Sequence, residues 1–305
     1  MYRRILLAVD AHRVAESAVA AVVQLAAASR AEVLVVHVRD IERGLRTRFE
    51  DEHLVDHVVG QLRDAGVAAR GEVRTISNGD VADALVDSAA RFAADVIALG
   101  SHGRSELGGL LLGTVGQRVV TRTDCAVMLV HGDPTGPSRR WPDSVERILL
   151  AVDRNVQRDQ AVEAACGLAR QHGAEVVVQY VDPVFESVTS ARRFVRDILR
   201  QLRTEGVPAR TAGLAGVGDV SAQIAAEAER VDADVIVIGS RRRGDLAALV
   251  LGSVARDLVR RTARPVLLAE TAAPGTGQRR DSSSGRSERG PSTSSRFRPS
   301  GGQVT

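Results

Sequence analysis

An internal duplication constrains the fold of this chain more than any other feature. The heptapeptide RILLAVD at residues 4–10 returns unchanged at residues 147–153. Two further pairs of segments repeat in the same order: EVLVVHV (32–38) with EVVVQYV (175–181), and ADVIALGS (94–101) with ADVIVIGS (233–240). The offset is 143 residues for the first two pairs and 139 for the third. We therefore expect two copies of one domain, with four residues deleted between the second and fourth strands of the second copy.

Short apolar runs alternate with segments of helical periodicity in each copy. In the first copy we expect strands at residues 4–9, 32–38, 67–76, 95–99 and 126–131, and helices at 14–29, 46–65, 80–92 and 116–122. This alternation predicts right-handed crossovers and a parallel sheet covered by helices on both faces. Asp80 is the expected N-cap of the third helix. The residues expected to face the core are Phe49, Leu54, Val58 and Leu62 of the second helix and Val119 and Val120 of the fourth.

The composition fits such a fold. Of the 305 residues, 44% are apolar but only 3% are aromatic, so the core must be built from Val, Leu, Ile and Ala, as in buried parallel sheets. No apolar run reaches the roughly 18 residues of a spanning helix, and no secretory signal precedes the first strand. Cys125 and Cys166 lack a metal-ligand spacing and are expected to be reduced core residues. We expect a cytoplasmic protein that does not bind membranes.

The chain divides into four predicted regions: a first domain at 1–132, a linker at 133–144, a second domain at 145–270 and a tail at 271–305. The tail is rich in Ser, Gly, Arg and Pro and is expected to be disordered. It could tether an anionic partner or be phosphorylated, although a solvated tail is the simpler interpretation. Its six Arg and two acidic residues account for the net charge of +3, which leaves the domains nearly neutral. We therefore expect no nucleic-acid partner.

A glycine-rich loop at residues 100–113 joins the fourth strand to the fourth helix of the first copy. Glycines allow the backbone to approach an anion, and the first turn of a helix presents free amides to it. Thr114 could cap the helix or donate to a phosphate oxygen. The alternative is a loop that only needs tight turns. In parallel sheets ligands bind beyond the carboxyl ends of the strands, where Asp10 and Val38 would lie beside this loop. Together these groups suit a nucleotide, with Val38 against the base and Asp10 as an acceptor.

The same residues resemble the universal stress protein family. Its motif, Gly-x2-Gly-x9-Gly-Ser/Thr, is matched by Gly100, Gly103, Gly113 and Thr114. The resemblance covers both copies. It implies two tandem Rossmann-like domains of the adenine nucleotide α-hydrolase-like α/β class, each with a five-stranded parallel sheet in the order 3-2-1-4-5. It also implies pairing through the last strand of each domain, an internal pseudo-dimer, and leaves further dimerisation open.

The resemblance assigns site residues as well. Asp10 and Val38 would contact adenine, and the residues that would hold ribose and phosphates are Gly100, Ser101, His102, Gly103, Gly113, Thr114 and Val115. Arg104 could pair with a phosphate, although a solvated loop charge explains it equally well. A possible second nucleotide site contains Asp153, Val181, Gly239, Arg242, Gly252, Ser253 and Val254. Arg242 replaces the second glycine of the motif and should weaken this site, unless arginine side chains grip the phosphates instead.

Other residue patterns are weaker indications of chemistry. His53 and His57 stand one helical turn apart and could share a metal, but no third ligand is evident and a solvated helix face is favoured. His37 is expected to be a hydrogen-bonded core residue. A phosphoryl-transfer P-loop, a nucleophile elbow and a dinucleotide fingerprint after the first strand are all missing from the sequence.

We therefore expect a regulator that binds ATP, with Mg²⁺ accompanying the phosphates, rather than an enzyme. Nucleotide occupancy would change its conformation or its binding to unknown protein partners, and ATP hydrolysis would be slow or absent. One alternative is an interaction or scaffold protein of the same fold that binds no nucleotide. A true ATP-dependent enzyme would need a base near the γ-phosphate, which the sequence does not show.

Overall fold

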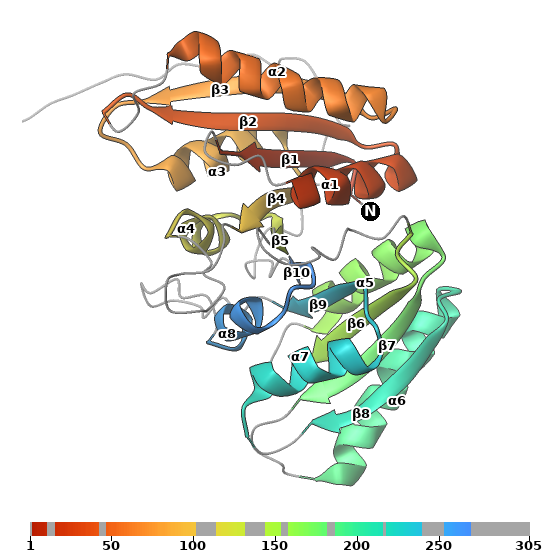
Figure 1. Cartoon of the computed structure of the whole chain (residues 1–305). Coiled ribbons are helices and arrows are strands. Elements are labelled where there is room, and N and C mark those ends of the chain that lie inside the picture. Colours follow the sequence, from red (N-terminus) through yellow and green to blue (C-terminus); the bar gives the residue numbers. More distant parts are fainter. Residues whose placement is uncertain are drawn as a thin grey trace, which may run out of the picture. The chain divides into compact units, whose positions relative to one another are not determined.

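A computed structural model describes residues 2–10, 16–42, 47–101, 114–131, 144–153, 158–181, 187–215, 218–239 and 253–269 (Figure 1). These ranges fall within one compact unit, residues 1–272. The predicted tail at 271–305 and nearly all of the predicted linker lie outside the described residues.

Helices and strands alternate along both copies. The first copy contains β1 (Arg4–Val9), α1 (Glu16–Ser29), β2 (Glu32–Asp40), α2 (Arg48–Asp64), β3 (Ala68–Ile76), α3 (Val81–Phe92), β4 (Val96–Ser101), α4 (Thr114–Arg122) and β5 (Ala126–His131). The second contains β6 (Arg147–Val152), α5 (Arg158–His172), β7 (Glu175–Val181), α6 (Val188–Thr204), β8 (Ala209–Ala215), α7 (Val220–Arg230), β9 (Val235–Gly239), α8 (Ser253–Arg261) and β10 (Val266–Ala269). The strands and helices expected from the sequence are all present, with ends that differ by a few residues.

Ten strands form one sheet in the order β3-β2-β1-β4-β5-β10-β9-β6-β7-β8. Each half has the predicted order 3-2-1-4-5 with parallel pairing throughout. The halves join where β5 pairs with β10 in antiparallel fashion, with Met128 opposite Leu267. This is the pairing through last strands that the family resemblance implies, and it makes the sheet mixed rather than purely parallel.

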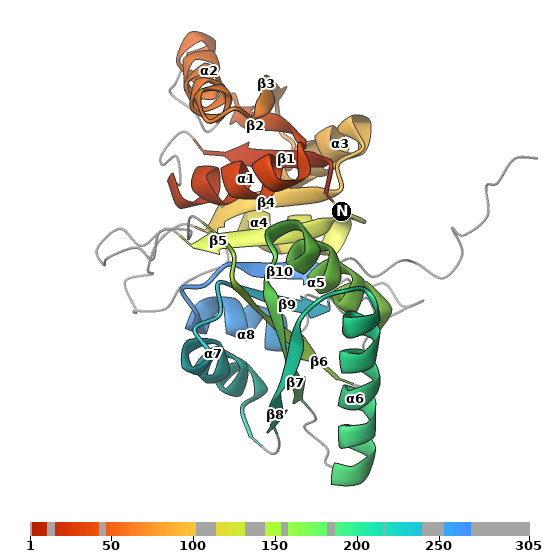
Figure 2. The ribbon, with the colours of Figure 1, turned by 90° about the vertical axis from the view of Figure 1, so that its right-hand side faces the viewer.

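Both faces of the sheet are covered, because successive side chains of a strand point to opposite faces. Ile5 and Leu7 belong to a core cluster with residues of α1, α2, α5 and α6, whereas Leu6 belongs to a second cluster with residues of α3, α4, α7 and α8. Figure 2 shows α5 and α6 on one side of the strands of the second half and α7 and α8 on the other. Val119 and Val120 are buried as predicted.

The prediction that Phe49 faces the core is wrong. Helix α2 begins at Arg48, and the side that it turns to the sheet carries Val55, Val58 and Leu62. Phe49 lies in the first turn on the opposite side and is 75% exposed. The prediction failed because Phe49 lies in the first turn of the helix, where an apolar residue need not reach the core.

The four deleted residues fall in two places. The N-cap residues of α2 and α6, Thr47 and Ser187, are 140 positions apart, so three residues are lost between β7 and α6. Those of α3 and α7, Asp80 and Asp219, are 139 apart, so the fourth is lost near β8. The register of β7 and β8 also shifts in this region, because Ala212 is an extra residue of β8 between Thr211 and Gly213. Gly213 has a φ of +113°, which favours glycine.

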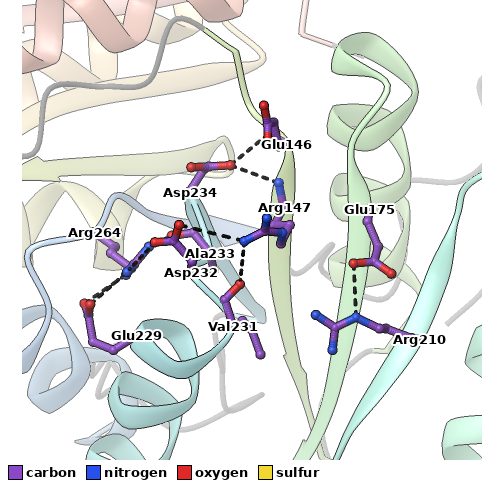
Figure 3. Close-up of polar contacts among 10 residues, drawn as sticks. All are labelled: Glu146, Arg147, Glu175, Arg210, Glu229, Val231, Asp232, Ala233, Asp234 and Arg264. Carbon is purple, nitrogen blue, oxygen red and sulfur yellow. Dashed lines mark hydrogen bonds and ion pairs between the residues drawn. The ribbon is translucent and has the colours of Figure 1, made fainter.

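Each half fastens the start of its first strand to the start of its fourth with one aspartate. The Asp234 carboxylate accepts the amides of Glu146 at 2.8 Å and Arg147 at 2.9 Å (Figure 3). Asp95 does the same in the first half, with the amides of Arg3 at 2.6 Å and Arg4 at 2.8 Å. These clips occupy the amino ends of the strands, which leaves the carboxyl ends for another role.

Candidate ligand site at the carboxyl ends of the strands

Three strand ends of the first half meet at one edge of the sheet. Strand β1 lies between β2 and β4, with Val9 opposite His37 and Ala8 opposite Leu99. The strand order reverses at this point, which is where ligands bind in open α/β sheets. The next residues along these strands are Asp10, Val38 and Gly100, and each is half-buried. The structure thus brings these three predicted site residues together.

The predicted phosphate cradle is only partly described. His102, Gly103, Arg104 and Gly113 lie outside the described residues. Ser101 ends β4 opposite His131, Thr114 is exposed at the first position of α4, and the half-buried Val115 packs against the second core cluster. Thr114 therefore opens the helix that the sequence predicts to face the phosphates, and the cradle itself stays a prediction.

The helix that carries Thr114 is held by salt bridges from its other end. Arg118 and Arg122 of α4 contact the Asp80 carboxylate at 3.1 and 2.6 Å, while Asp80 caps α3 through the Ala82 amide at 3.0 Å. Burial by itself raises the pKa of Asp80, but the Ala82 amide and the two guanidinium groups outweigh it and hold that pKa below its ordinary value of 3.8. Asp80 is therefore the predicted cap and also an anchor for α4.

A buried polar cluster lies at the ends of β1 and β2 on the face of the sheet that α2 covers, whereas Val38 belongs to the opposite face. His37 is 6% exposed, its Nδ1 lies 3.0 Å from the Val9 carbonyl oxygen, and its Nε2 lies 3.5 Å from Asp51 of α2. Arg39 Nε lies 3.3 Å from the other carboxylate oxygen of Asp51, which is 1% exposed. His37 is the hydrogen-bonded core residue that the sequence predicts. Asp51 was not foreseen, although an acid on the side of α2 that carries Val55 and Val58 was a usable signal.

Three strand ends also meet at the carboxyl edge of the second half of the sheet. Val152 pairs with Tyr180 and Ala151 with Ile238, so Asp153, Val181 and Gly239 meet at the strand ends. Arg242 and Gly252 lie outside the described residues, whereas Ser253 and Val254 open α8, the one exposed and the other half-buried.

The polar cluster has no counterpart in the second half. At the positions of His37 and Asp51 stand Tyr180, which is 1% exposed, and Ala191, which is 2% exposed. The Tyr180 ring packs edge-on against Phe194 at a centroid distance of 5.5 Å. The polar cluster under α2 in the first half is therefore replaced by an aromatic pair under α6 in the second.

Other functions find less support in the described residues. His53 and His57 are both exposed on α2, and the described part of the chain contains no group of three or more His, Cys, Asp or Glu that could hold a metal. None of the described helices has the length and hydropathy needed to cross a bilayer. Cys166 is buried and Cys125 is half-buried, so Cys125 is less buried than predicted. Burial raises the pKa of the Cys166 thiol, which disfavours the reactive thiolate.

Parallel order 3-2-1-4-5, crossover helices on both faces and polar groups at the switch point place both halves in the doubly wound α/β class. The model of the universal stress protein family matches residues 1–131 and 144–270. The chain therefore belongs to the universal stress protein family, as a tandem member with two family domains.

Relatives agree with this assignment. A universal stress protein of Mycobacterium tuberculosis is 27% identical over 187 residues, which cover 58% of this chain and 62% of the relative. One from Thermus aquaticus is 32% identical over 144 residues, 43% of this chain and the whole of the relative. The crystal structure of a universal stress protein from Archaeoglobus fulgidus superposes with a TM-score of 0.71 at 21% identity, covering 88% of this chain and 98% of that one. The last comparison shows the tandem fold alone.

Proposed function

We propose that this protein is a nucleotide-regulated member of its family that binds ATP at the strand ends of its first half. The convergence of Asp10, Val38 and Gly100 at the switch point carries the proposal. A half-buried apolar side chain, a carboxylate and a glycine-rich approach to a helix start match a base, a sugar or base donor and a phosphate chain. Mg²⁺ would arrive with the phosphates rather than occupy a protein cage.

We further propose that the protein acts as a regulator and not as a dedicated enzyme. The sequence offers no base for water or for a hydroxyl acceptor beside the place that the γ-phosphate would take. Hydrolysis would then be slow or absent, and the useful signal would be the change in conformation or partner binding when nucleotide occupies the site. We expect the protein to act in the cytoplasm.

Calorimetric titration of ATP–Mg²⁺ into the full chain tests the binding proposal. We expect one site per chain, lost or strongly weakened in Asp10→Ala and retained in Asp153→Ala, because the second half has Arg242 at a motif glycine. The two variants are matched controls, since Asp10 and Asp153 end identical heptapeptides. The nucleotide site would be ruled out if ATP, ADP and AMP produced no heat of binding and no thermal stabilisation of the protein.

The alternative is a scaffold of the same fold that binds partners through its surface and takes no nucleotide. Replacement of Gly113 by Val separates the two functions, because a branched side chain would block close approach of a phosphate to the loop. Regulation is supported if the Gly113→Val variant no longer binds ATP and still captures its partner, but in a way that nucleotide no longer affects. Wild-type partner capture that never responds to nucleotide supports the scaffold.

A further inference from the structure

The two equivalent outer helices of the duplicated domains, α2 and α6, have net charges of opposite sign. Helix α2 contains five acidic and two basic residues, a net charge of −3 with its histidines neutral. Helix α6, at the equivalent place in the second half, contains five arginines and one aspartate, a net charge of +4. They cover β3 and β8, the two ends of the ten-stranded sheet (Figures 1 and 2). A shared ancestor explains the fold of these helices but not their opposite charges.

The difference is concentrated on the side of each helix that faces away from the sheet. On α2 a stripe of residues at helical spacing, here the acidic stripe, consists of Phe49, His53, Asp56, Gly60 and Asp64. The equivalent residues of α6, here the arginine stripe, are Thr189, Arg193, Arg196, Arg200 and Thr204. All ten are exposed except the half-buried Gly60.

No charged residue of either stripe forms an ion pair with another helix or strand in the described part of the chain. Arg193 and Arg196 form no salt bridge there, and Arg200 pairs only with Asp197 of its own helix, at 3.1 Å. Asp56 and Asp64 also form none with the described residues. These charges are therefore available to an outside partner with the opposite sign.

The two helices also offer apolar surface to each other. A shallow open hollow on α6 is lined by Arg196, Leu199, Arg200, Arg203 and Thr204. Phe49, the most exposed large apolar residue of the described chain at 75%, stands at the start of the acidic stripe. A phenyl ring could fill such a hollow, with Leu199 beneath it and guanidinium groups against its face.

A lipid surface does not account for these observations. Four apolar residues of α6, Ala191, Val195, Ile198 and Leu202, are buried against the sheet. Val188 at the start of the helix is 45% exposed, and Phe194 and Leu199 are half-buried, so no continuous apolar face remains for insertion. A polyanion would fit the arginine stripe but leaves the acidic stripe and Phe49 unexplained. A partner that carries both surfaces explains all of them.

We propose that this protein associates with a second copy of itself through α2 of one copy and α6 of the other. An antiparallel arrangement brings Phe49 to the hollow near the end of α6, Asp56 opposite Arg196 and Asp64 to the start of α6, beyond Arg193. Each copy carries both surfaces, so the contact can close into a dimer or continue head to tail.

Sedimentation velocity of the full chain at several concentrations tests this proposal. We expect reversible association that weakens at 0.5 M salt, because the contact is largely electrostatic. The variants Arg193→Glu/Arg196→Glu and Asp56→Arg/Asp64→Arg should each raise the dissociation constant at least about tenfold, since like charges then face each other. A mixture of the two variants should associate again, because each supplies the charge that the other has lost.

Two controls make the result specific. Arg260→Glu reverses one charge at an exposed site on α8, on the opposite face of the second half, and should leave association unchanged, whereas Arg193→Glu or Arg196→Glu alone should weaken it. Phe49→Ala should weaken association without changing its salt dependence. A monomer at all concentrations, or a mixture of the charge variants that stays apart, would overturn the proposal. Association that is lost in the α2 variant but kept in the α6 variant would also overturn it, because the arginine-rich tail would then be the partner of α2. Binding of added heparin by a protein that does not self-associate would overturn it as well.

Discussion

At single positions the two halves solve the same structural problem with different side chains. Cys125 and Arg264 occupy equivalent positions, and both donate to the equivalent carbonyl, that of Ala94 from Sγ at 3.0 Å and that of Ala233 from the guanidinium. Arg264 is 1% exposed and also pairs with Glu229 at 2.8 Å (Figure 3). A small donor suffices where the neighbours are apolar, whereas the longer one needs a carboxylate to balance its charge.

The aspartate clips should contribute more to the free energy of unfolding than exposed carboxylates usually do. We expect Asp234→Ala to lower the free energy of unfolding by about 1–3 kcal/mol, because two backbone amides lose a charged acceptor. Urea denaturation measures the change. Asp197→Ala removes an exposed carboxylate of the same type and should cost much less. Equal losses in the two variants would contradict the assignment of the clip.

The helix caps predict a dependence of stability on pH. The pKa values of Asp80 and Asp219 both lie below the ordinary 3.8 in the folded chain, Asp219 through hydrogen bonds from Ser221 and Ala222 and the charge of Arg261. A carboxyl with a depressed folded pKa contributes stability that is present above its unfolded pKa and lost as the pH falls through its folded pKa. Wild-type stability should therefore drop below about pH 4.

Denaturation of Asp80→Asn and Asp219→Asn between pH 7 and pH 3 tests this dependence. Each variant should be less stable than wild type at pH 7 and should converge toward it at pH 3, because the asparagine cannot lose a charge. A constant difference across this range would show that the caps act without their charge.

At the scale of helices and strands, local sequence sets where an element begins and packing sets how it sits. Thr47 and Glu50 form a capping box that starts α2, with the Glu50 carboxylate 2.7 Å from the Thr47 amide. The close fit of α2 on β3 depends instead on Gly71, since a Cβ there would overlap Cγ1 of Val55.

Two glycines near α2 should therefore respond oppositely to alanine. Gly71→Ala should lower the free energy of unfolding by about 1–3 kcal/mol through overpacking. Gly60→Ala should raise it by about 0.5–1 kcal/mol, because Gly60 lies within the helix and nothing lies within 4 Å of its added Cβ. Thermal and urea denaturation of both variants provide the measurement, and changes of the same sign would contradict the packing of α2 on β3.

At the scale of the whole molecule, the antiparallel pairing of β5 with β10 turns two domains into one sheet. Val127, Met128 and Leu129 pair with Leu268, Leu267 and Val266, and all six are buried. Neither half could be separated without exposing an apolar strand edge, which is a template for pairing with another chain.

The first half alone, residues 1–131, should therefore dimerise through its bare β5. The equivalent strand β10 shows that antiparallel pairing of this strand type is compatible with the fold. Light scattering after size exclusion would give the mass, with Met128→Arg as the variant that should keep the half monomeric. If the wild-type first half stays monomeric, the exposed edge of β5 is not sufficient for two halves to pair.

Much of this fold follows from particular residues read in order. The repeated RILLAVD heptapeptide, the apolar runs and the Asp80 cap predicted both domains, the alternation of strands and helices along the chain and one helix boundary, because these features depend on neighbours in sequence. The strand order within each sheet came from the family resemblance. The candidate site was likewise found from Asp10, Val38 and Gly100, which end strands that parallel topology must bring together. Its loop residues His102, Gly103, Arg104 and Gly113 remain predictions.

What the sequence alone determined was the element order, the duplication and the edge of the sheet where a ligand would bind. Tertiary structure decided that Phe49 points to solvent, that Asp51 is buried beside His37, and that Cys125 and Arg264 serve the same carbonyl. It also placed the acidic and arginine stripes on equivalent outer surfaces. The physical reason is distance along the chain: periodicity fixes which residues share a face, but only packing between remote segments fixes what each face meets.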